Sequence, residues 1–250
     1  MRLDAGVTLI EVVVAVTLLS LLTVGMAMAI RVGLAAYSKT ESKLMENRRI
    51  AGAQRILQAE LEGLTPVFVA CSATPTSPGV RAALFQGEPS MMWLASTFSL
   101  QQGWRGRPQL LELFVIPGED GMGVRLVVNE IPYTGARGAG LYCPTLATSP
   151  TTGSRIPQFM PMDAGPNSFV LADKLALCRF AYYTPNRQAD LPPSWETEWT
   201  GRGWPLAVRV EMVPLSPDPS KLQSITVTAP LHIRRDPDVK YEDKYKGAGE

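Results

Sequence analysis

The chain has 250 residues and carries 24 Lys and Arg against 23 Asp and Glu, for a net charge of +1. This length allows one membrane segment and one domain of ordinary size, or two small domains. The near balance of charge excludes the basic surface on which nucleic-acid binding or attraction to acidic lipids depends, so no nucleic-acid partner is expected.

The first predicted element is an apolar helix close to the N-terminus. From Val12 to Ile30 the chain runs for 19 residues without a charge. At about 1.5 Å per residue such a helix crosses most of a hydrocarbon layer of roughly 30 Å. Glu11 at its head is the exception, because a carboxylate in lipid costs on the order of a few kcal/mol and normally has a partner or a function.

A new chain terminus would supply that partner. Cleavage between Gly6 and Val7 places an α-amino group four residues before Glu11. An ammonium group with a pKa of about 8 and a carboxylate attract each other strongly once water is excluded. Cleavage after Gly, an apolar first residue, Thr second and Glu fifth together form the prepilin signature.

The segment MRLDAG-VTLIEVVVAVTLLSLL therefore resembles the N-terminus of type IV pilins and of type II secretion pseudopilins. The resemblance implies that a prepilin peptidase removes residues 1–6 and methylates Val7, although Phe is commonest at that position in the family. It also implies that Glu11 faces the terminal amine of a neighbouring subunit in a filament. The expected location is the inner membrane, single-pass, with the C-terminal head in the periplasm.

Two other interpretations of the apolar segment remain open. One is a secretory signal peptide, since Ala27, Met28 and Ala29 offer an A-x-A cleavage site, and the other is a plain membrane anchor. Three positive charges follow the apolar segment, and by themselves they would favour a cytoplasmic C-terminal side: Arg31, Lys39 and Lys43. The predicted topology therefore depends on the prepilin signature.

The helix is predicted to continue to Glu62, because residues 31–62 contain no proline and apolar residues recur every three or four positions. Gly63 is expected to end it as a C′ glycine, with Pro66 soon after. The apolar stripe that contains Ile50, Leu57 and Leu61 has two explanations. It contacts a partner helix, or it packs only against the chain's own sheet.

The rest of the chain predicts a head of antiparallel strands, because no helical pattern separates the β patterns. The expected fold class is α+β, a long N-terminal helix packed on an antiparallel sheet. Residues 132–167, with six prolines, predict a long loop region. The predicted divisions are a leader at 1–6, a transmembrane or filament helix at 7–30, an amphipathic helix at 31–64, a periplasmic head at 65–234 and a disordered tail at 235–250. Predicted strands are 66–71, 80–85, 91–97, 110–116, 123–129, 168–171, 175–184, 206–213 and 222–233.

Several head segments resemble, in order, the second half of the J-type minor pseudopilin of type II secretion. They are LADKLALCRFAYYTPN, SWETEWTGRGWP and LAVRVEM leading to LQSITVTAPLHI, and the helix segment RRIAGAQRILQAELEGL is similar as well. The resemblance implies a complex with I-, K- and H-type minor pseudopilins and the major pseudopilin, which helps move folded proteins across the outer membrane. The alternatives are a minor pilin of a type IV pilus or DNA-uptake apparatus, and a membrane-anchored periplasmic binding or enzymatic module.

No catalytic, metal-binding or cofactor-binding constellation stands out, so the chain is not expected to be an enzyme. His232 is the single histidine, no C-x-x-C occurs, and the loop acids Glu119, Asp120, Asp190, Glu196 and Glu198 match no calcium-loop spacing. Packing over the sheet is favoured over an exposed patch for Trp195, Trp199 and Trp204. Cys71, Cys143 and Cys178 allow one internal disulfide, although buried unpaired thiols are the favoured expectation and the pairing is left open.

Overall fold

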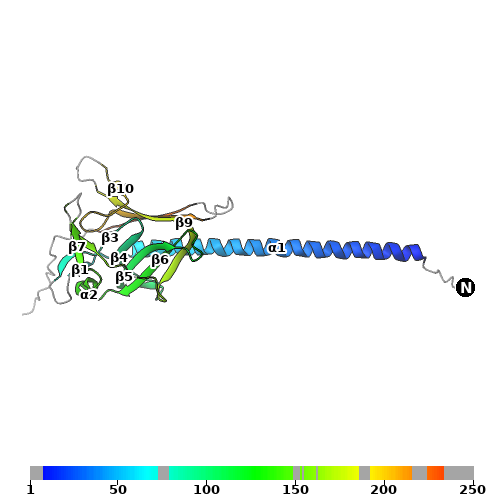
Figure 1. Ribbon diagram of the computed structural model, residues 1–250, viewed down its shortest axis with the longest axis horizontal. Helices are drawn as coiled ribbons and strands as arrows, with labels where there is room; N and C mark the ends of the chain where they lie inside the picture. Colours follow the sequence, from blue (N-terminus) through cyan, green and yellow to red (C-terminus); the bar gives the residue numbers. More distant parts are fainter. Residues whose placement is uncertain are drawn as a thin grey trace, which may run out of the picture. The chain divides into compact units, whose positions relative to one another are not determined.

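The computed structural model describes residues 8–72, 79–148, 153, 155–161, 163–185, 192–215 and 224–233. The chain divides into two units, Met1–Arg49 and Ile50–Glu250, and each is described by itself. A long N-terminal helix is followed by an antiparallel sheet domain, as Figure 1 shows, which confirms the expected α+β class and is consistent with a pilin-like fold. The predicted leader and tail lie outside the described residues.

Helix α1 runs from Leu9 to Glu62, so its predicted end is confirmed, while the predicted start at Val7 lies outside the described residues. The structure gives a different reason from the predicted one for glycine at position 63. Its backbone is not in the left-handed conformation that a C′ glycine adopts. Instead, a Cβ at this position would come within 2.5 Å of the Ser96 Oγ. The glycine is therefore required because a strand of the sheet passes close to the end of the helix.

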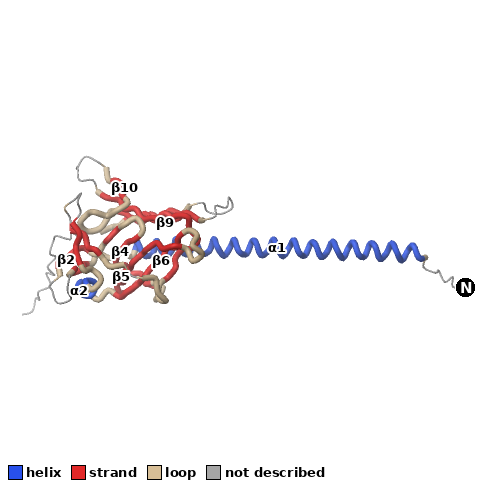
Figure 2. The backbone as a smooth tube through the Cα atoms, in the orientation of Figure 1, coloured by secondary structure: helices blue, strands red, loops and turns tan. Residues whose placement is uncertain are grey.

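The rest of the described chain forms the head, which consists mainly of strands and loops (Figure 2). The elements after α1 are β1 (Phe68–Cys71), β2 (Val80–Ala83), β3 (Gln86–Gly87), β4 (Met91–Ser99), β5 (Trp104–Pro117), β6 (Val124–Pro132), α2 (Ala136–Gly140), β7 (Thr145–Thr148), β8 (Arg155–Gln158), β9 (Phe169–Thr184), β10 (Ser194–Glu196), β11 (Ala207–Pro214) and β12 (Ile225–Pro230). The nine predicted strand segments all coincide with observed strands, whereas β3, β7, β8 and β10 were not predicted.

The main sheet has eight strands in the order β12-β11-β9-β6-β5-β4-β3, with β10 paired to β9. Every described pair is antiparallel, as predicted. The predicted hairpin is confirmed, because Pro117 of β5 pairs with Val124 of β6 and the Gly118 amide donates to the Gly123 carbonyl at 3.0 Å. Strands that are consecutive in the sequence, such as β3 to β6, are therefore also neighbours in the sheet.

The two segments predicted at 168–171 and 175–184 form the single strand β9. Lys174 has a φ of 55°, and the pairing with β11 shifts register between Val213 and Pro214. A bulge therefore lets one continuous strand pass through a break in the hydrophobic pattern. The predicted strand 222–233 is shorter than expected, since β12 covers Ile225–Pro230 and residues 216–223 lie outside the described part.

One face of the sheet is covered by the C-terminal part of α1. Leu57 and Leu61 have no exposed surface and pack in one core with side chains of the central strands. These include Met92 and Leu94 of β4, Leu111 and Leu113 of β5 and Val208 and Val210 of β11. For Leu57 and Leu61 the structure therefore shows burial against the chain's own sheet, whereas the side chain of Ile50 lies outside the described residues.

The opposite face carries a second core, which the sequence did not predict. Trp93 of β4 stacks on Phe159 with ring centroids 4.6 Å apart, and Leu110 of β5 and Ala139 of α2 belong to the same cluster. The prediction that residues 132–167 form a loop is wrong for α2, β7 and β8. β7 and β8 satisfy their backbone groups by pairing with each other, and α2 buries Ala139 in the second core. These elements therefore form without a periodic apolar pattern.

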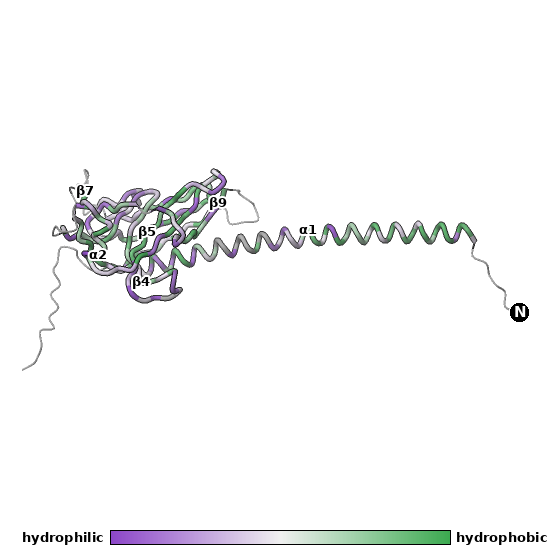
Figure 3. Tube along the Cα trace, turned by 60° about the horizontal axis from the view of Figure 1, so that its bottom comes forward, coloured by the Kyte–Doolittle hydropathy of each residue, from purple (hydrophilic) through white to green (hydrophobic). Residues whose placement is uncertain are grey.

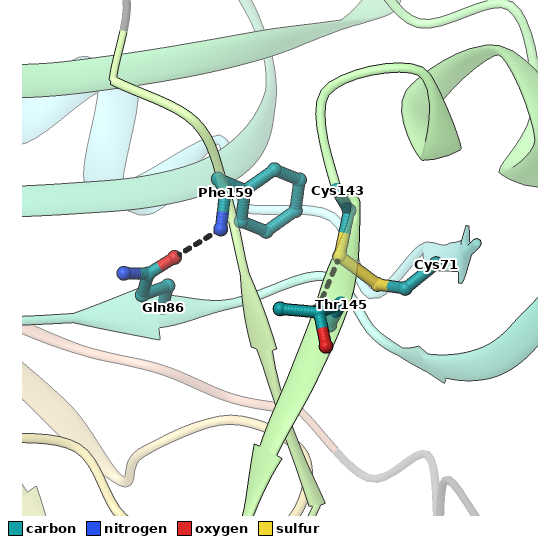
Figure 4. Close-up of a disulfide and its surroundings, with 5 residues drawn as sticks. All are labelled: Cys71, Gln86, Cys143, Thr145 and Phe159. Carbon is teal, nitrogen blue, oxygen red and sulfur yellow. Dashed lines mark hydrogen bonds between the residues drawn. A yellow bond between two sulfur atoms is a disulfide. The ribbon is translucent and has the colours of Figure 1, made fainter. Parts of the chain in front are cut away.

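A disulfide joins Cys71 of β1 to Cys143, 72 residues later (Figure 4). The favoured expectation of unpaired thiols is therefore wrong for these two cysteines and correct for Cys178, which is free and buried. Figure 4 also shows the side chain of Gln86, whose oxygen accepts a 2.7 Å hydrogen bond from the Phe159 amide. These two links attach the segment after β6 to the rest of the head.

Candidate functional site

The N-terminal helix is the candidate functional site, because its surface is unlike that of a soluble protein. Residues Leu9–Glu41 form the one helix among the described residues that is long and apolar enough to cross a membrane. Its apolar side chains are exposed, Leu9 by 84% and Leu21 by 70%. Figure 3 shows the apolar colouring along this helix. Such a surface requires lipid or other helices around it.

The helix begins immediately before Glu11. The Thr8 carbonyl accepts hydrogen bonds from the amides of Glu11 at 3.1 Å and Val12 at 3.3 Å, and Glu11 lies in the first turn. A negative side chain is favourable at this position because the helix dipole is positive at its N-terminus. The carboxylate of Glu11 is exposed and is therefore available to a group outside the helix.

The other polar side chains within the apolar segment are satisfied by the helix itself. The hydroxyls of Thr17, Ser20 and Thr23 donate to backbone carbonyls three or four residues earlier, at 2.8 to 3.0 Å. No hydrogen bond or ion pair joins the Glu11 carboxylate to any residue that the structure describes. Glu11 is thus the group in this segment that needs a partner from elsewhere.

A strip of small residues on the same helix was missed in the sequence analysis. Gly25, Ala29 and Gly33 recur every fourth position, and a Cβ added at either glycine would meet nothing within 4 Å. In membranes such spacing lets the backbone of another helix approach closely. The four-residue spacing in the sequence was a sufficient signal for finding it.

The structure describes some of the predicted site residues and not others. Gly6 and Val7 lie outside the described residues, as does the side chain of Ile50. Leu57 and Leu61 belong to the core of the head and have no surface for a partner helix in the single chain. Glu11 is the predicted site residue that the structure places on an accessible surface.

Two buried titratable groups in the head have raised pKa values. Burial raises the pKa of the Cys178 thiol to about 12, so it is protonated and unreactive at neutral pH. Burial also raises the pKa of Glu60 to about 8; the Ser96 hydroxyl partly opposes this rise and Glu130 adds to it. Both Glu60 oxygens are buried, and no contact to them among the described residues has the geometry of a full hydrogen bond.

The head shows no arrangement that holds a metal within the part of the chain that is described, where no three His, Cys, Asp or Glu side chains come together. His232 is exposed, and Asp190 lies outside the described residues. The expected packing is confirmed for Trp199, which is buried against Phe85, and for Trp204, which contacts the ring of Phe68 edge-on. Trp195 is half-buried, with its ring centroid 5.0 Å from that of Tyr183.

Comparison with known protein families gives one match. The prokaryotic N-terminal methylation motif covers residues 1–27, the segment that contains Gly6, Val7 and Glu11. The match supports a type IV pilin-like protein. It implies processing by a prepilin peptidase and assembly with other pilin-like proteins, and it suggests a structural, non-enzymatic role. The single N-terminal apolar helix is consistent with the membrane anchor of such a protein.

The match ends at residue 27 and does not extend to the head of the chain. No curated protein is significantly similar to the chain.

Proposed function

We propose that this pilin-like chain is a J-type minor pseudopilin of a type II secretion system. In this role it belongs to the pseudopilus tip or priming complex that helps move folded proteins across the outer membrane. The observation that carries the pilin-like part of this proposal is Glu11, an exposed carboxylate in the first turn of an apolar helix and inside the methylation motif. The amino-acid sequences of four head segments support the J type by their resemblance, in this order: 171–186, 194–205, 206–212 and 222–233.

The proposed processing follows from the same segment. The prepilin peptidase cuts between Gly6 and Val7 and methylates the new amine of Val7. The amine of one subunit then pairs with Glu11 of its neighbour, which removes two unpaired charges from an apolar environment. In this proposal the leader remains in the cytoplasm, the helix lies in the inner membrane and the head lies in the periplasm.

The proposed partners are I-, K- and H-type minor pseudopilins and the major pseudopilin. Because Leu57 and Leu61 are buried in the head, we assign helix-to-helix contact to the preceding apolar part of α1. The Gly25, Ala29 and Gly33 strip offers a close approach there. This assignment replaces the predicted partner contact at Leu57 and Leu61.

The intact mass of the full-length protein purified from membranes tests the proposed processing. The expected mature chain lacks residues 1–6 and carries one additional methyl group on Val7. A Gly6→Leu variant should keep the leader and lack the methyl group, because a bulky side chain blocks the peptidase. A wild-type chain that begins anywhere other than Val7 would contradict the proposal.

A minor pilin of a type IV pilus or DNA-uptake apparatus has the same N-terminal motif, so it remains the alternative. Co-purification separates the two functions. The full-length chain should retain I- and K-type partners from cells that contain a type II secretion system. Retention of pilus subunits instead would support the alternative.

A further inference from the structure

The head contains an open cleft that none of the features described so far uses. Its volume is about 250 Å³. It lies between the β1–β2 hairpin, the β7–β8 ribbon and the loop that follows Trp199. Its apolar lining includes Phe68, Phe85 and Pro157, all of them buried.

Three arginines from separate segments line this cleft. Arg81 comes from β2, Arg155 from β8 and Arg202 from the loop before β11, whereas no Asp or Glu is among the described lining residues. Neither Arg81 nor Arg155 forms an ion pair with a carboxylate in the described part of the chain. Arg202 has another interaction within the molecule, so the argument depends on the first two arginines.

The position of Arg81 is fixed by aromatic packing. Its guanidinium carbon lies 3.8 Å from the centroid of the Phe68 ring, and Trp204 contacts the same ring edge-on at 5.9 Å. β1, which carries Phe68, is tied by the disulfide at Cys71. A side chain held in this way loses little further freedom when it binds a ligand.

The mouth of the cleft has little side-chain bulk on one side. Gly201 and Gly203 line it, and Gly203 has a φ of 80°, which a residue with a side chain rarely adopts. A Cβ at Gly201 would come within 2.6 Å of the Trp199 ring. The loop conformation therefore depends on glycine at both positions, and it leaves the arginines accessible.

Arg81 and Arg155 line one cleft with no carboxylate among its described lining residues, so an anion bound there would be favoured electrostatically. Arginine pairs with carboxylates through two parallel hydrogen bonds, which gives direction as well as charge. The volume is below the roughly 300 to 1,000 Å³ of cofactor pockets, so the cleft suits one or two side chains. The chain's balanced net charge gives no extended basic surface of the kind nucleic acids require.

We propose that this cleft binds an acidic segment of a partner protein, with carboxylate side chains paired to Arg81 and Arg155. The occupant is defined by charge complementarity, and the inference is independent of the N-terminal helix and its processing. A chain that is processed differently from our proposal would keep the cleft unchanged.

Fluorescence titration of the full-length chain in detergent tests the proposal with a labelled peptide of alternating Asp and Glu. The matched probe replaces each Asp by Asn and each Glu by Gln. We expect saturable binding of the acidic peptide alone, weakening as salt is added. The double variant Arg81→Gln/Arg155→Gln should lose about tenfold or more in affinity, whereas Arg107→Gln/Arg137→Gln, with exposed arginines outside the cleft, should bind like the wild type.

Arg81→Lys keeps the charge, so it should retain more affinity than Arg81→Gln if charge is what binds the peptide. Equal losses in the two double variants, or equal binding of the two peptides, would overturn the proposal. Displacement of the peptide by inorganic phosphate at the same concentration would identify a small-anion site and would also overturn it. Tighter binding by a chain truncated after Arg234 would assign the cleft to its own C-terminal segment, whereas unchanged binding supports a partner.

Discussion

At the scale of single residues, Glu60 is a carboxyl group that has no exposed surface and no well-formed hydrogen bond among the described residues. Its pKa in the folded chain is about 8, against 4.5 for the exposed group, because burial disfavours the charged form. Below about pH 4.5 both the folded and unfolded states carry the proton. Between these two pH values only the folded state keeps it, so stability falls as the pH rises.

We expect Glu60→Gln to remove this dependence on pH. The free energy of unfolding of the variant relative to wild type should rise from pH 4.5 to about pH 8 by roughly 3 to 5 kcal/mol and then remain constant. Denaturant unfolding of both full-length chains in the same detergent measures the difference. Parallel curves for the two chains across this range would show that Glu60 is ionised in the folded head.

Gly63 gives a second prediction at this scale. In Gly63→Ala the new Cβ would meet the Ser96 Oγ at 2.5 Å, the Ala59 carbonyl at 3.0 Å and the Phe98 amide at 3.2 Å. We expect a loss of about 2 kcal/mol or more in unfolding free energy. Gly52→Ala is the matched control, because its Cβ meets nothing within 4 Å, and it should stabilise the helix by about 0.5 to 1 kcal/mol. Equal effects of the two variants on thermal unfolding would contradict the close approach at Gly63.

At the scale of elements, the disulfide between Cys71 and Cys143 closes a long stretch of the head. Because the cysteines are 72 positions apart in the sequence, loss of the disulfide should cost about 4 kcal/mol through the greater freedom of the unfolded chain. Cys71→Ser, Cys143→Ser and the double variant should be destabilised by similar amounts, since each loses the same bond. Unfolding midpoints of the oxidised full-length chains test this. A double variant much less stable than either single variant would argue against the bond.

The elements also show where prediction from sequence succeeded. Alternating apolar and polar residues were enough to find β11 and β12, because each has one buried face. β4 was found as well, although Met92, Trp93, Leu94 and Ala95 are buried in succession. Its continuous apolar run reflects burial on both faces, and this was the available sign of a second layer over the sheet.

At the scale of the whole molecule, Glu11 should matter for assembly and not for insertion. Glu11→Ala should still enter the membrane and lose residues 1–6, but it should retain about tenfold less partner, because the terminal amine of its neighbour lacks a counter-charge. Intact mass measures processing, and co-purification of the full-length chain measures assembly. Glu41→Ala, at the other end of the apolar segment, is the control and should behave like the wild type. Normal partner recovery with Glu11→Ala would contradict this role.

The membrane helix and the prepilin motif could be predicted from sequence because their signals are local. A run of apolar residues, one carboxylate and a cleavage signature are properties of consecutive positions, and neither folding nor packing changes them. The motif match at residues 1–27 and the helix from Leu9 agree with that prediction. The same was true of the order of helix and sheet, because hydrophobic period distinguishes the two.

The tertiary structure decided what depends on contacts between distant residues. The disulfide joins Cys71 to Cys143, and Leu57 and Leu61 are buried against strands far from them in the sequence. Arg81 and Arg155 likewise come from distant segments that line one cleft. A stripe of leucines has the same pattern whether it faces a partner or the chain's own sheet. Only the packed structure distinguishes them, because burial depends on which surfaces finally come together.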